Sequence, residues 1–114
     1  MITHFFGEFS LAEFLEARQT VATAPLISPD YSHIIDFSAV SRFTLTAEEV
    51  QQLARQPSVL PPETLQVIVA PDPAAFQLAR MFQTYTEPLR PHIHVVKTLA
   101  DALNRIKALK GKAS

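Results

Sequence analysis

The sequence predicts an α/β domain with a single, mainly parallel sheet of four to five strands and helices on both faces. Residues 65–70, LQVIVA, form a short apolar run that is typical of a strand buried on both faces. Asp72 and Pro73 follow at once, and they suit the N-cap and the first position of a helix. Strand-like and helix-like segments alternate along the whole chain, which favours parallel strands joined by helical crossovers.

Each predicted strand is followed by a recognisable helix start. Ser10 and Thr46 each precede a glutamate by three residues, which is the spacing of a capping box. Thr98 likewise precedes an acidic residue, Asp101, by three residues, at the start of the last segment with apolar residues at helical spacing. Prolines separate the segments, because the residue before a proline avoids helical backbone. The sequence therefore predicts strands over residues 2–9, 31–40, 65–70 and 92–97, with helices beginning after Ser10, Thr46, Asp72 and Thr98.

Length and composition indicate one ordinary globular domain over residues 1–114. The net charge of -1 gives no basic surface for nucleic acid or for an anionic membrane. No apolar run approaches the roughly 18 residues that cross a bilayer, and the start, MITHFFGEF, does not have the form of a signal peptide. The chain has no cysteine, which excludes disulfides and thiolate chemistry and is compatible with the cytoplasm, where we expect the protein. Its two glycines exclude glycine-rich nucleotide loops, so we expect no cofactor.

Histidines and carboxylates near strand ends are the candidate reactive groups. His92 and His94 would share one face of their strand, where they are either simply solvated or supply two ligands of a metal site completed by His4, His33 or an acidic residue. Asp36, Asp72 and Lys97 come near the carboxyl ends of three strands, where open α/β sheets bind ligands. Two carboxylates and a lysine resemble the phosphorylation site of a response-regulator receiver domain. The first strand, however, lacks the paired acidic residues that such a site needs. No serine lies in a Gly-x-Ser-x-Gly turn. We therefore expect no catalytic residues and no resident metal.

Two stretches resemble the SpoIIAA-like branch of the STAS superfamily, which is named after sulfate transporters and anti-sigma-factor antagonists. The first is HIIDFSAVSRFTLTAEEV at residues 33–50, in which a strand ends in Asp-Phe-Ser and a turn leads into a helix. The second is VIVAPDPAAFQLARMFQ at residues 67–83, followed by a further strand and Thr-Leu-Ala-Asp-Ala-Leu. Together with the alternation of strands and helices, the resemblance covers most of the chain.

The resemblance implies a non-enzymatic regulatory module in the bacterial cytoplasm that binds a protein partner, such as an anti-sigma factor or a kinase. The position that matches the family's phosphorylated serine is Thr46, where Thr44, Leu45 and Ala47 replace the usual Asp, Ser and Gly. A plain N-cap role also explains Thr46. Ser41 is a further candidate for phosphorylation. The contact surface is expected in a loop over residues 38–46 and beside the third helix, with these residues: Asp36, Ser38, Ser41, Thr44, Thr46, Asp72 and Phe76.

Two further hypotheses concern what the domain binds. The first strand is expected to leave an unpaired edge, and two copies can associate as a homodimer through this edge or through a helix face. Alternatively, the domain is a carrier for a small apolar ligand, since parts of the superfamily are grouped with lipid-binding folds of the Sec14 type. The ligand would then lie in an apolar cavity under the Phe-rich first strand and the strand over residues 65–70.

Overall fold

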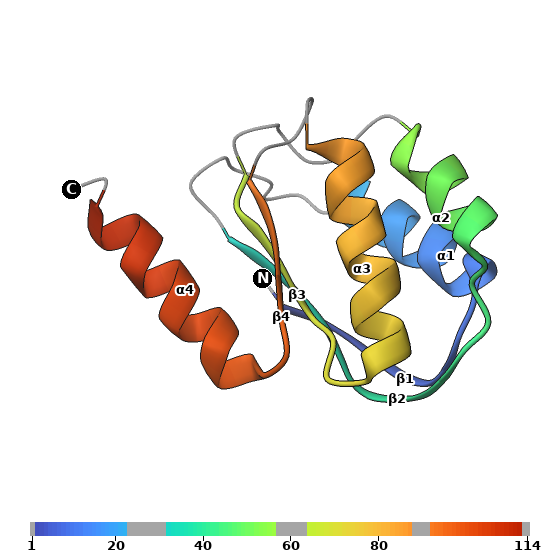
Figure 1. Cartoon of the computed structure of the whole chain (residues 1–114), viewed down its shortest axis with the longest axis horizontal. Coiled ribbons are helices and arrows are strands. Elements are labelled where there is room, and N and C mark those ends of the chain that lie inside the picture. The colour runs from blue at the N-terminus through green and yellow to red at the C-terminus, as the bar shows by residue number, and fades with distance from the viewer. Residues whose placement is uncertain (1, 23–31, 57–63, 88–91, 113–114) are drawn as a thin grey trace.

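The computed structural model describes residues 2–22, 32–56, 64–87 and 92–112 (Figure 1). The predicted proline breaks at residues 25, 57–62, 88 and 91 lie outside these ranges. Within them, four strands alternate with four helices: β1 (Ile2–Phe9), α1 (Leu11–Ala22), β2 (His33–Phe43), α2 (Ala47–Ala54), β3 (Gln66–Val69), α3 (Pro73–Thr86), β4 (Ile93–Val96) and α4 (Leu99–Lys112).

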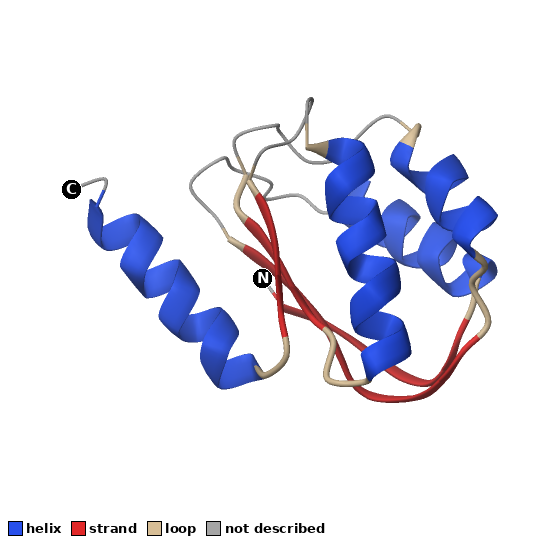
Figure 2. Cartoon of the chain, viewed as in Figure 1, coloured by secondary structure: helices blue, strands red, loops and turns tan. Residues whose placement is uncertain are grey.

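The four strands form one sheet in the order β1-β2-β3-β4, and every neighbouring pair is parallel. Figures 1 and 2 show α1, α2 and α3 on one side of this sheet and α4 on the other. The connections between successive parallel strands are all right-handed, and because the strands lie in consecutive order these connections place α1, α2 and α3 on the same face of the sheet. α4 follows β4 and connects to no further strand in the sheet, so it can cover the opposite face. The predicted fold class, a parallel sheet with helices on both faces, is confirmed.

β3 joins the two hydrophobic layers of the domain. All four of its residues are buried, and their side chains alternate between the faces of the sheet. Val67 and Val69 pack on the side of α4, together with Ile34, Val96 and Ala102. Ile68 packs on the side of α3, together with Ala70, Ala75, Ala79 and Ile93. We call these two sides the α4 face and the α3 face.

The predicted helix starts at Thr46, Asp72 and Thr98 are confirmed. Thr46 forms a complete capping box with Glu49 at the start of α2. Asp72 caps α3 by accepting hydrogen bonds from the N–H groups of Ala74 and Ala75, and Pro73 occupies the first turn. At α4, the hydroxyl of Thr98 accepts from the N–H of Asp101 over 3.0 Å. These bonds satisfy N–H groups that a helix cannot satisfy internally.

β2 begins and ends later than predicted, because it spans His33–Phe43 where residues 31–40 were expected. β1 pairs with it throughout, with register shifts between His4 and Phe6 and between Gly7 and Glu8. Such bulges bend a strand pair, and the φ of 66° at Gly7 is one that glycine adopts without strain. Beyond Asp36, β1 and β2 form a two-stranded extension that curves toward α1 and α2 (Figure 1).

The last strand is shorter than predicted, since β4 spans Ile93–Val96 and not residues 92–97. His92 lies in the turn before it and is exposed. None of the helices in the described ranges has the length and apolar character needed to cross a membrane.

Candidate functional site

The predicted contact loop over residues 38–46 is mostly strand, so this part of the prediction is wrong. Residues 38–43 belong to β2 and pair with β1, which leaves residues 44–46 as the connection to α2. The hydroxyl of Ser41 donates to the carbonyl of Gly7 over 3.2 Å. The hydroxyl of Thr44 donates to the carbonyl of Phe9 over 3.1 Å. Both side chains therefore hold the β1–β2 extension together.

Thr46 is exposed and engaged in its cap. Its hydroxyl accepts from the N–H of Glu49 over 3.1 Å, and the Glu49 carboxylate accepts from the N–H of Thr46 over 2.9 Å. A phosphate on Thr46 would be favoured by the helix N-terminus but repelled by the carboxylate of Glu49. The role of Thr46 as a phosphoacceptor stays a prediction.

Asp72 and Phe76 lie at the start of α3, and Asp36 lies on the other face of the sheet. Asp72 is used by the helix cap described above. Phe76 is half-buried against the α3 face, and the ammonium group of Lys97 lies 5.3 Å from its ring centroid. Asp36 is two residues after Ile34, so its side chain lies on the α4 face. The fold thus does not gather the seven predicted contact residues into one site.

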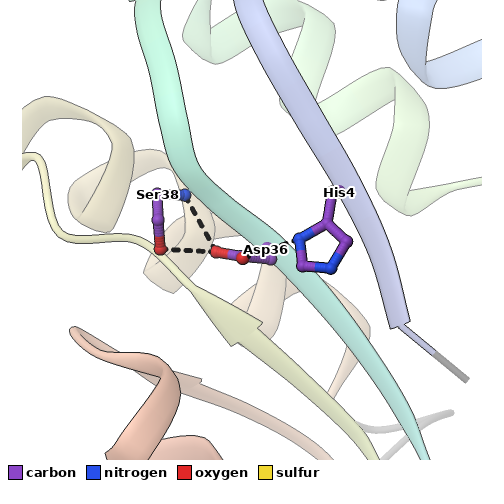
Figure 3. Close-up of polar contacts among 3 residues, drawn as sticks. All are labelled: His4, Asp36 and Ser38. Atoms are coloured by element: carbon purple, nitrogen blue, oxygen red, sulfur yellow. Dashed lines mark hydrogen bonds and ion pairs between the residues drawn. The ribbon is translucent and has the colours of Figure 1, made fainter.

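His4, Asp36 and Ser38 form a polar cluster on the α4 face (Figure 3). Nδ1 of His4 lies 2.9 Å from Oδ2 of Asp36. The other carboxylate oxygen accepts from the hydroxyl of Ser38 over 2.5 Å and from its N–H over 2.9 Å. Burial acts to raise the pKa of Asp36, but the hydrogen bonds from Ser38 and His4 outweigh it and leave the pKa below its usual value.

The order of these three groups does not suit nucleophilic catalysis. In a serine nucleophile the hydroxyl gives its proton to a histidine, which an acid orients. Here the carboxylate lies between the two, and the Ser38 hydroxyl donates to it. Sequence reasoning missed the pairing of His4 with Asp36, because a pattern of alternation does not fix which residues of two strands face each other. The geometry makes this cluster a structural link between β1 and β2.

A metal site built on His92 and His94 is not supported by the arrangement of strands. His94 is on β4 and His4 is on β1, so they lie on opposite edge strands of the sheet. Among the residues that the structure describes, no group of three His, Asp or Glu side chains is placed to hold a metal ion.

An apolar cavity of about 140 Å³ lies between the α3 face of the sheet and the helices α1, α2 and α3. Its walls are mainly apolar. Phenylalanines from the sheet and from the helices form much of the lining: Phe5, Phe9, Phe14, Phe37, Phe43 and Phe82. Aliphatic side chains from each neighbouring helix complete it, among them Ala17, Val50, Leu53, Leu78 and Ala79.

The sheet side of the cavity has an aromatic end and a polar end. Toward the carboxyl ends of β1 and β2, the rings of Phe5, Phe9 and Phe37 pack together with centroids 4.7 to 5.3 Å apart. Toward the amino ends, Thr3, His33 and Gln66 line the cavity from three adjacent strands. His33 and Gln66 are register partners in β2 and β3.

His33 is the unusual member of this lining. It is 6% exposed, and its Nε2 is 2.8 Å from the hydroxyl of Thr3. Its Nδ1 is buried and has no hydrogen-bond partner in the described part of the chain. Burial lowers the pKa of His33 to about 4, so the imidazole is neutral at pH 7. A buried nitrogen without a partner is costly, so Nδ1 of His33 lowers the stability of the fold.

Comparison with family models, with curated proteins and with solved structures finds no match for this chain.

Proposed function

We propose that this domain is a non-enzymatic binding module that holds a small, mainly apolar molecule between its sheet and the helices α1–α3. The observation that carries the proposal is the cavity of about 140 Å³ with its phenylalanine lining. A cavity of about 150 Å³ lined by Leu, Ile and Phe binds benzene, so this volume is enough for a single ring. When no ligand fills it, such a cavity lowers the stability of the folded protein, because the atoms that line it lack packing partners.

α1 provides the way in. The side chains at residues 11–19 of this helix are exposed or half-buried, and none is fully buried. Phe14 contacts Phe82 of α3 with centroids 6.5 Å apart, and Leu15 is 45% exposed. A helix held by few buried contacts opens at a low free-energy cost. A ligand can therefore reach the cavity without unfolding of the sheet.

Benzene is a suitable first probe, with binding followed by the rise in melting temperature and by NMR shift changes. Ala17→Leu adds carbon atoms at the cavity wall and should weaken benzene binding at least tenfold. Ala12→Leu is the matched control, because Ala12 is an exposed alanine of the same helix and does not line the cavity. If benzene fails to bind to the unaltered protein, or binds equally to both variants, the proposal is wrong.

A second candidate function is the STAS-like one, a regulatory module that recognises a protein partner or a second copy of itself in the cytoplasm. β1 is the edge strand of the sheet, and in the described ranges no strand pairs with its outer side. Phe6 is 71% exposed and Ile2 is 45% exposed on this strand. Exposed edges with apolar residues favour pairing with another chain.

Light scattering after size-exclusion chromatography tests self-association through this edge. A dimer that Phe6→Ser converts to a monomer, and that Leu103→Ser leaves intact, would support it, since Leu103 is 53% exposed on α4. A strict monomer at high concentration would count against it. Affinity capture from a bacterial lysate with the same two variants tests for an anti-sigma factor or a kinase as the partner.

A further inference from the structure

We propose that β1 pairs with β1 of a second copy as antiparallel strands, in the register that places Phe6 opposite the second copy's Phe6 and His4 opposite its Glu8. This inference rests on the second candidate function, since it requires that the chain associates with itself through the β1 edge. It adds the orientation of the two copies, the register of the two strands and the residues that select this register.

The even-numbered side chains of β1 form one exposed row on the α4 face of the sheet: Ile2, His4, Phe6 and Glu8. The imidazole of His4 contacts Asp36 on this face, and its ring centroid lies 6.4 Å from that of Phe6. Glu8 precedes Phe9, which lines the cavity on the opposite face. Phe6 is 71% exposed and Ile2 is 45% exposed. The row therefore places two apolar side chains, a histidine and a carboxylate along the outer edge of the sheet.

The backbone of β1 offers hydrogen-bonding groups along the same edge. The carbonyls of Gly7 and Phe9 accept hydrogen bonds from Ser41 and Thr44, so they are directed toward β2. Backbone groups of successive residues in a strand point to alternate sides, which directs those of the even-numbered residues outward. An edge of this kind is a template for a further strand.

The antiparallel orientation follows from symmetry. Two copies that use the same surface patch are related by a two-fold axis. When this axis is perpendicular to the sheet, the two β1 strands run antiparallel and the α4 faces of both copies lie on the same side. Residues that are directly opposite each other then have their side chains on the same face. Each even-numbered residue of β1 therefore lies opposite an even-numbered residue of the second copy.

The charges of the exposed row select the register. With Phe6 at the two-fold axis, the two Phe6 rings meet and His4 lies opposite Glu8 on both sides of the axis. With His4 at the axis, two imidazoles lie opposite each other. With Phe5 at the axis, Glu8 lies opposite Ile2, which places a charge against an apolar side chain. The register centred on Phe6 is the only two-fold arrangement of β1 that pairs the histidine with the carboxylate.

The contact with Asp36 leaves His4 suited to this pairing. Nδ1 of His4 lies 2.9 Å from Oδ2 of Asp36. In an imidazolium both ring nitrogens are donors, so Nε2 can donate to the second copy's Glu8 while Nδ1 keeps its contact with Asp36. The dimer thus extends a link that each copy already contains.

Sedimentation equilibrium of the full chain at about pH 6, near the pKa of an unperturbed histidine, is the first test. The dissociation constant of the dimer should rise about tenfold in Glu8→Lys, because two lysines would then lie opposite His4. Glu87→Lys is the matched control, since Glu87 is an exposed carboxylate at the end of α3. It should leave the dissociation constant unchanged.

The second test uses the unaltered protein and does not depend on how a variant folds. In a mixture of isotope-labelled and unlabelled chains, filtered NMR should detect an NOE between the imidazole of His4 in one copy and the side chain of Glu8 in the other. Within one copy these residues are four positions apart on a strand, or about 13 Å, so the NOE can arise only between copies.

The outcomes separate this inference from the candidate function on which it rests. If the chain is a strict monomer at high concentration, self-association is wrong and this inference fails with it. If Phe6→Ser dissociates the dimer, but Glu8→Lys does not and no NOE joins His4 to Glu8, the edge forms the dimer and the proposed register is wrong. If the dimer survives both Phe6→Ser and Glu8→Lys, the copies meet through another surface and the inference is refuted.

Discussion

His4 and Asp36 lie opposite each other on β1 and β2, with Nδ1 of the imidazole 2.9 Å from Oδ2 of the carboxylate. The same carboxylate accepts two hydrogen bonds from Ser38. The first register shift between the two strands begins directly after this pair. Asp36 thus joins the regular sheet to its bent extension.

Replacement of Asp36 should destabilise the domain. Asp36→Ala is expected to lower the free energy of unfolding by about 1–3 kcal/mol. The imidazole of His4 and the N–H and hydroxyl groups of Ser38 would lose the carboxylate to which they hydrogen-bond. Glu8→Ala is the control, since Glu8 is an exposed carboxylate on the same strand pair. Urea denaturation at pH 7 measures both variants. Equal stability of Asp36→Ala and Glu8→Ala would show that the link contributes nothing.

The contribution of Asp36 should depend on pH in the direction of its lowered pKa. A carboxyl group whose pKa is lower in the folded state than in the unfolded state stabilises the fold above the unfolded value. This stability is lost as the pH falls from the ordinary value of 3.8 through the lowered one. Denaturation curves of the unaltered protein and of Asp36→Asn should therefore converge in acid.

His33 should make the protein less stable in mild acid. Its pKa is about 4 in the folded protein against 6.5 for an ordinary histidine. Between these values the unfolded chain binds a proton that the folded chain does not, so stability rises with pH across this window. The loss from pH 7 to pH 4 is expected to be about 3 kcal/mol. His33→Gln should flatten this dependence, whereas His92→Gln, at an exposed position, should leave it unchanged.

The capping role of Thr46 is separable from a role in phosphorylation. Thr46→Ala should cost about 1 kcal/mol of unfolding free energy, because the N–H of Glu49 loses its acceptor. Thr46→Ser keeps a hydroxyl and should cost little. Mass spectrometry of the protein from its native cell tests the second role. If both Thr46 and Ser41 are found only in unphosphorylated form, the phosphoacceptor hypothesis is wrong.

Hydrogen exchange should identify α1 as the least protected helix around the cavity. Its side chains at residues 11–19 are exposed or half-buried, whereas α2 buries Val50, Leu53 and Ala54. Addition of benzene should slow exchange in α1 more than in α4, which lies on the other side of the sheet. Equal protection of α1 and α2 without ligand would contradict the proposed way in.

The parts of the fold that local chemistry determines were predictable from the sequence. The apolar run at β3 and the caps at Thr46, Asp72 and Thr98 each depend on a few neighbouring residues, and the structure confirms them. The carboxyl end of β2 was not predictable. Residues 41–43 extend the strand beyond the predicted end at residue 40, and their extended backbone depends on pairing with the distant β1.

The candidate site was predictable only in outline. An apolar cavity near the first strand and residues 65–70 was expected, and Phe5, Phe9 and Ile68 do line one. His33 was missed as its polar member. The available signal was its place two residues before Ile35, on the same side of a strand that carries Phe37. Its contact with Thr3 depends on strand register, which no local pattern contains.

The consecutive order of the strands has a consequence for how the chain assembles. Each strand pairs with the strand before it in the sequence, so the ribosome releases every new strand next to an edge that already exists. The sheet can then grow by one strand at a time, although each parallel pairing joins residues that are far apart in the sequence and so forms slowly. α4 follows β4 in the chain and covers Val67 and Val69 with Ala102, so interruption of synthesis before residue 99 would leave these apolar side chains exposed to water and the chain prone to aggregation.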